Sequence, residues 1–89
     1  MDTESILAEL MRQAPPSLQT LGGSFLSLNE QARTIKMAFE ADERLCHSGN
    51  IIQGGFVTGM VDAAMAYVVI ALLGPNVRVP TLEIKVSFI

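Results

Sequence analysis

"NIIQGGFVTGMVDAAMAYVVIALLG", residues 50–74, is the longest apolar segment of the chain and decides how the fold is interpreted. It opens with a glycine pair, Gly54 and Gly55, and contains one charged side chain, Asp62. Apolar residues follow without a break until the sequence Gly-Pro-Asn, which is typical of a helix end. The segment therefore predicts a long helix over about residues 55–73, and the role of its single carboxylate has three interpretations.

The first interpretation is a membrane-spanning helix. Its length is near the lower limit for a span, and Gly55 and Gly59 have the spacing that lets membrane helices pack closely. Asp62 opposes this interpretation, because a carboxylate near the centre of a span costs roughly 2.5–3.5 kcal/mol. No basic flank or aromatic belt anchors the ends, and alternating segments lie on both sides. The sequence therefore favours a chain that does not enter a membrane.

The second interpretation is a core helix covered by a sheet, because a helix that is apolar on every side belongs in an interior. Asp62 would then be a hydrogen-bonded structural acid. A lone buried carboxylate is costly unless it is paired, and no basic partner is near it in the sequence.

The third interpretation joins the glycines and the acid in one catalytic site. A helix start carries free N–H groups, and Gly54 and Gly55 have no side chain to shield them from a carbonyl oxygen. Asp62 lies eight residues after Gly54, about 12 Å along a helix axis, too far to act on the same carbonyl. A second subunit packed antiparallel would supply its own Asp62, so this interpretation requires a dimer.

The flanking segments predict a mixed architecture. Apolar residues at helical spacing precede Pro15-Pro16, and strict alternation marks two later segments. We therefore expect, in order, a helix over 3–14, a hairpin of strands over 24–29 and 33–41, a loop over 42–53, the long helix, and a strand over 81–89. This order predicts a single α+β domain with an antiparallel sheet around the long helix.

Composition excludes several classes of function. The six basic residues are scattered and the net charge is −3, which disfavours a nucleic-acid surface. Cys46 and His47 are the only residues of their types, so an intramolecular disulfide and a cysteine- or histidine-rich metal site are excluded. The acidic start lacks the features of a signal peptide, and we expect a cytoplasmic protein. A domain of 89 residues buries a modest fraction of its surface, which favours self-association.

The ordered set of segments resembles the hotdog-fold acyl-CoA thioesterases of the phenylacetic-acid-pathway type, called PaaI-like. The resemblance covers residues 15–89 and rests on "PPSLQTLGG", "RTIKMAFEADERL", "IIQGGFVTGMVDAAMAYV" and "VPTLEIKVSFI". It implies a sheet wrapped around the central helix, hydrolysis of acyl thioesters without a metal or other cofactor, and a dimer or tetramer. CoA would be part of the substrate.

The resemblance also implies roles for individual residues. Asp62 would be the nucleophile or general base, the Gly54 N–H would polarise the thioester carbonyl with Gly55 beside it, and Thr81 would help to place the water. Gln53 stands where the family usually has histidine and donates a hydrogen bond without titrating.

Other family positions differ in this chain. Asn50 stands where the family often has glycine, and His47 where it often has an asparagine that orients the carboxylate, so either residue would take that role. Phe56, Met60 and Met65 are candidates to line the acyl group, although core filling is their more usual role.

Family members continue past the last segment with further strands, so the resemblance implies that residues 1–89 form a C-terminally truncated hotdog domain. The chain would then be a shortened product, a part of a longer protein, or a form that completes its sheet by strand exchange. The alternative function is a non-catalytic fragment that binds acyl thioesters or serves as an assembly subunit.

Overall fold

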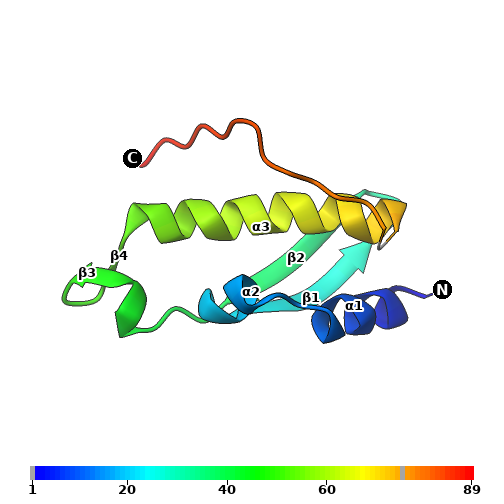
Figure 1. The fold of residues 1–89 in the computed structure, drawn as a ribbon, viewed down its shortest axis with the longest axis horizontal. Coiled ribbons are helices and arrows are strands. Elements are labelled where there is room, and N and C mark those ends of the chain that lie inside the picture. Colours follow the sequence, from blue (N-terminus) through cyan, green and yellow to red (C-terminus); the bar gives the residue numbers. More distant parts are fainter. Residues whose placement is uncertain (1, 75) are drawn as a thin grey trace.

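The computed structural model describes residues 2–74 and 76–89 and shows an α+β chain (Figure 1). A long helix packs across a two-stranded antiparallel hairpin, and two short helices precede the hairpin. The elements in chain order are α1 (Thr3–Arg12), α2 (Pro16–Thr20), β1 (Gly23–Asn29), β2 (Thr34–Phe39), the 3-10 turn η1 (Glu43–Leu45), β3 (Cys46–Ser48), β4 (Ile51–Ile52) and α3 (Gly54–Leu73).

Helix α1 begins and ends as its sequence indicates. The Asp2 side chain accepts a hydrogen bond from the Ser5 N–H at 2.8 Å, which caps the helix start. The helix ends at Arg12, two residues before the predicted end, ahead of Pro15 and Pro16. Pro16 is then the first residue of α2, where its missing N–H costs nothing, and sequence analysis missed this short helix.

The predicted hairpin is present, and a bulge decides which of its side chains face the core. Gly23 pairs with Phe39 at one end, and the register shifts between Phe25 and Ser27. Leu26 is the extra residue on β1 and is 63% exposed, whereas Leu28 is 8% exposed. The bulge therefore breaks the simple alternation and brings Phe25 and Leu28 to the same face.

A second, smaller sheet occupies the segment that was predicted to be a loop. Strands β3 and β4 pair antiparallel around Gly49, which has a φ of +62°. Leu45 at the start of this segment is 3% exposed, and its carbonyl accepts a hydrogen bond from the Gln53 N–H at 2.9 Å. This contact ties the small sheet to the start of α3.

Helix α3 is present with nearly the predicted bounds, and its core contacts lie toward its C-terminal end. Leu10, Leu28 and Ala71, from α1, β1 and α3, form the buried cluster. Phe25 packs its ring edge-on against Tyr67, with centroids 4.9 Å apart. By length and composition α3 could cross a membrane, a property that it shares with core helices of soluble proteins.

The strand predicted over 81–89 was wrong. Residues 76–89 form a chain without helix or strand, called here the C-terminal segment. This segment runs back along α3 on the side away from the hairpin (Figure 1). A strand needs a neighbouring strand for its hydrogen bonds, and α3 separates this segment from β1 and β2. Consequently the hairpin covers one side of α3 and does not wrap around it.

Candidate functional site

The start of α3 presents two backbone donors, as predicted. Phe56 and Val57 donate their N–H groups to the Gln53 carbonyl at 3.0 and 3.3 Å, which begins the helical hydrogen-bond pattern. The N–H groups of Gly54 and Gly55 precede this pattern, so they lack an acceptor within the helix. The Gln53 side chain makes no capping bond, and the first turn contains no acidic residue. This end of α3 can therefore receive a carbonyl oxygen or an anion.

The two glycines have different surroundings. A β-carbon at Gly54 would lie 3.2 Å from the ring of Phe88, so this aromatic side chain of the C-terminal segment stands against the helix start. A β-carbon at Gly55 would meet nothing within 4 Å. Gly55 is exposed, and the Phe88 side chain is itself 62% exposed. The open approach to the helix start is therefore on the Gly55 side.

Asp62 is joined to Thr81 by a hydrogen bond. The Thr81 hydroxyl donates to Oδ1 of Asp62 at 2.5 Å, although 19 positions separate the two residues in sequence. Asp62 is half-buried, and Thr81 is exposed. These two candidate residues therefore lie together on the side of α3 that faces the C-terminal segment, while two helical turns separate Asp62 from the Gly54 N–H.

The polar residues before α3 do not join Asp62 within one chain. His47 and Asn50 are exposed in and beside the β3–β4 turn, and Gln53 is exposed at the helix cap. The Nδ1 atom of the His47 ring lies 2.8 Å from the hydroxyl oxygen of the adjacent Ser48. Among the described side chains none of these three is hydrogen-bonded to Asp62.

The apolar candidates lie along α3 with different exposure. Phe56 and Met60 are half-buried, and Met65 is 48% exposed. These side chains, Asp62 and the glycine pair line neither the cleft at the other end of α3 nor the small cavity beside Tyr67. Within a single chain, Asp62 and Gly54 instead lie against the C-terminal segment, through Thr81 and Phe88.

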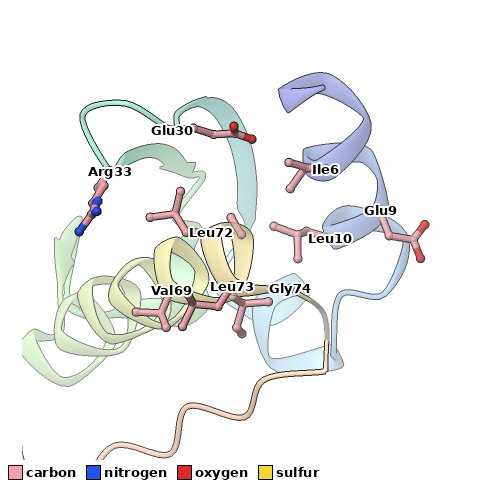
Figure 2. Close-up of a pocket in the computed structure, with 11 residues that line it drawn as sticks. Ile6, Glu9, Leu10, Glu30, Arg33, Val69, Leu72, Leu73 and Gly74 are labelled. Atoms are coloured by element: carbon pink, nitrogen blue, oxygen red, sulfur yellow. The ribbon is translucent and has the colours of Figure 1, made fainter. Parts of the chain in front are cut away.

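The larger cavity lies at the other end of α3, and sequence analysis missed it. It is a cleft of about 900 Å³ between α1, the β1–β2 turn and the last turn of α3 (Figure 2). Its walls are mainly apolar, and three charged residues lie at its rim, namely Glu9, Glu30 and Arg33. Glu30 and Arg33 belong to the β1–β2 turn and Glu9 to α1, so no local sequence pattern brings all three together.

A metal site is not assembled by the described part of the chain. Within residues 2–74 and 76–89, no three side chains among His, Cys, Asp and Glu come together in a group that could hold a metal ion. Cys46 is a free, half-buried thiol.

Comparison of the chain with models of known protein families, with curated proteins and with solved structures finds no match in any of the three. The chemistry of this chain is therefore argued from its own residues.

Proposed function

We propose that this chain is an acyl thioester hydrolase with a hotdog-type fold, acting on acyl-CoA or a related acyl thioester in the cytoplasm. The observation that carries the proposal is the hydrogen bond from Thr81 to Asp62, which joins two residues that the resemblance assigns to one site. The long apolar helix packed on an antiparallel hairpin supports the fold, and the glycine pair at the start of α3 supports the chemistry.

In this mechanism the thioester carbonyl oxygen accepts hydrogen bonds from the N–H groups at the start of α3. Gly55 offers the open approach, and Gly54 lies beside it against Phe88. These donors stabilise the negative charge that develops on the oxygen as the carbonyl carbon is attacked. Asp62 attacks directly or removes a proton from the attacking water, and the Thr81 hydroxyl holds its carboxylate in position. The C–S bond then breaks, and the CoA thiolate leaves and takes up a proton. Attack by water gives the free acid in this step, whereas direct attack leaves an anhydride between the acyl group and Asp62, which a water molecule then hydrolyses.

The site requires two copies of the chain. Asp62 lies about 12 Å along the helix from Gly54, so one chain cannot place both groups at one carbonyl. An antiparallel pair of α3 helices brings the Asp62 of one copy to the glycines of the other. Val61 and Met65, which flank Asp62, are 43% and 48% exposed, and burial of such apolar surface favours association.

The test is CoA release from a panel of aliphatic and aromatic acyl-CoAs, with each variant shown to be folded by circular dichroism. Asp62→Asn should reduce kcat by at least about 100-fold, the usual effect of removing a general base. Thr81→Val should give a smaller loss, and Glu83→Gln, which changes an exposed carboxylate of the same segment, should leave kcat unchanged.

Mixing two inactive variants tests the shared site. Gly54→Pro removes the N–H donor of residue 54. Proline is tolerated at the first position of a helix, and Gln53 already has the extended backbone (φ −65°, ψ 134°) that a residue before proline adopts, so this variant should fold. Random mixing of Asp62→Asn with Gly54→Pro chains should restore about a quarter of the wild-type activity, because half of the dimers then contain one intact site. Absence of recovery in mixed dimers would contradict a site built from two chains.

A second candidate function is non-catalytic binding of acyl thioesters or a role as an assembly subunit. It is favoured by the position of Asp62 outside the cleft at the other end of α3 and by the Phe88 ring against Gly54. A folded, dimeric wild-type chain that releases no CoA from any substrate in the panel would support this candidate and overturn the hydrolase.

A further inference from the structure

The cleft at the C-terminal end of α3 is separate from the proposed hydrolase site. It lies between α1, the β1–β2 turn and the last residues of α3, whereas Gly54 and Asp62 belong to the N-terminal half of the same helix (Figures 1 and 2). Its volume of about 900 Å³ is within the range of small-molecule sites, roughly 300–1,000 Å³. A ligand of this cleft is therefore independent of the thioester chemistry.

The walls of the cleft are suited to an aliphatic chain. Ile6 and Leu10 of α1 face Leu72 of α3 across the cleft in Figure 2, and Val69 and Leu73 form its lower side. Leu10 is 7% exposed and anchors this wall in the core, so the wall exists before a ligand arrives. Leu73 is 69% exposed, and covering such apolar surface is favourable.

The three charged groups at the rim are not equivalent. The Glu9 carboxylate is hydrogen-bonded to Arg12 and Gln13 and points away from the cleft in Figure 2. The Arg33 side chain extends along the outer side of Leu72. The Glu30 carboxylate points across the cleft toward Ile6, and among the described residues it has no ion pair. Arg33 also lines the cleft, so the negative charge is that of Glu30 on the Ile6 side, and the positive charge lies on the Leu72 side.

The end of α3 adds to this negative potential. The last carbonyl groups of a helix carry a partial negative charge, and the last turn of α3 contains no basic residue to balance it. The Ile70 carbonyl accepts the Gly74 N–H at 2.8 Å, but the usual donor for the Ala71 carbonyl would be residue 75, a proline without an N–H. The C-terminal residues of α3 and the Glu30 side chain thus line the same cleft, and both contribute negative potential to it.

We propose that this cleft binds a linear alkylammonium amphiphile, with its ammonium group between Glu30 and the C-terminal carbonyls of α3 and its chain along Ile6, Leu10 and Leu73. An ammonium group donates three hydrogen bonds and matches a carboxylate and free carbonyls, which are all acceptors. A fatty acid places like charge against Glu30, and a fatty alcohol lacks the charge that this end of the cleft attracts.

The experiment follows backbone amide NMR signals of the full chain during titration with octylammonium, octanol and octanoate, all below their micelle concentrations. Octylammonium should shift the signals of residues 6–10, 30–33 and 69–74 and bind more tightly than the other two compounds. Spermidine, which has charge without a long apolar chain, should bind more weakly than octylammonium. Equal binding of octanoate and octylammonium, or shifts outside the cleft, would overturn the proposal.

Two variants separate charge from hydrophobic contact. Glu30→Gln should weaken octylammonium binding by about two- to fivefold, as expected for one exposed charge interaction, and leave octanol binding unchanged. Glu40→Gln makes the same change at an exposed position that does not line the cleft, and its affinity should equal that of the wild type. If both variants lose the same affinity, the effect is one of net charge and Glu30 is not a ligand group.

Discussion

The two halves of α3 have similar apolar sequences but different surroundings. Ala71 in the C-terminal half is 8% exposed and belongs to the core with Leu10 and Leu28, and Tyr67 packs against β1. Val61 in the N-terminal half is 43% exposed, and none of the residues 54–63 is buried. Exposed apolar side chains also occur in the C-terminal half, where Met65 and Leu73 are 48% and 69% exposed. A helix that is apolar all round has no preferred face, so its neighbours decide which part is buried. The C-terminal half thus supplies the buried residue of α3, while both halves keep exposed apolar side chains.

The largest expected difference comes from shortening one buried side chain that packs against α3 and one exposed side chain of α3 itself. Leu10→Ala should lower the free energy of unfolding by about 2–5 kcal/mol, because Leu10 is buried against the C-terminal half of α3. Met65→Ala should cost less than about 1 kcal/mol in the monomer, since its side chain is half exposed. Urea denaturation at low protein concentration measures both values.

The same pair of variants also tests association. If α3 helices pair in a dimer, the loss of unfolding free energy caused by Met65→Ala should grow with protein concentration. The loss caused by Leu10→Ala should not grow with it in this way. Equal costs of the two variants in the monomer would refute this difference in burial.

An intermediate effect is expected at the glycine pair. The methyl group added by Gly55→Ala would have no atom within 4 Å. This variant should raise the free energy of unfolding by up to about 1 kcal/mol, because alanine loses less backbone entropy than glycine when a helix forms. Gly54→Ala should gain less, because its new methyl group must move the Phe88 ring, 3.2 Å away. Chemical denaturation gives the stabilities, and a change in the Phe88 ring signals in Gly54→Ala alone would establish the contact. Identical behaviour of both variants would exclude it.

The smallest effect concerns pH and the C-terminal half. Burial raises the pKa of the Tyr67 phenol above its usual value of 10.0. As pH rises past 10, the unfolded chain therefore loses this proton before the folded chain does. The protonated Tyr67 thus makes its full contribution to the free energy of unfolding below pH 10, and this contribution is lost above it. The free energy of unfolding of the wild type should fall more steeply between pH 9 and about 11 than that of Tyr67→Phe. Parallel curves would mean that Tyr67 is not effectively buried.

Local sequence signals predicted those elements that local interactions determine. The apolar run between Gly54 and Gly74 predicted α3 to within one residue at its start, and the alternation of Ile35, Met37 and Phe39 predicted β2. The same alternation over residues 81–89 was misleading, because the period of a strand indicates which face would be buried but does not supply a partner strand.

For the candidate site, the sequence located single residues but not their environment. The glycine pair predicted free N–H donors, and these follow from the helix start alone. The resemblance assigned Thr81 and Asp62 to one site without predicting a contact between them, and the contact of Phe88 with Gly54 was not expected either. Both depend on the path of the C-terminal segment along α3, which arises from contacts between residues distant in sequence.

The sequence by itself therefore determined α1, the β1–β2 hairpin and α3, their order and the free donors at the start of α3, because hydrogen bonds and side-chain periods within short segments specify them. Tertiary structure alone decided that Leu28 is buried while Leu26 is exposed, that the hairpin covers one side of α3, and that Glu30 borders a cleft with Leu10. These features depend on where separate elements meet, and a helix that is apolar on every side does not specify that position.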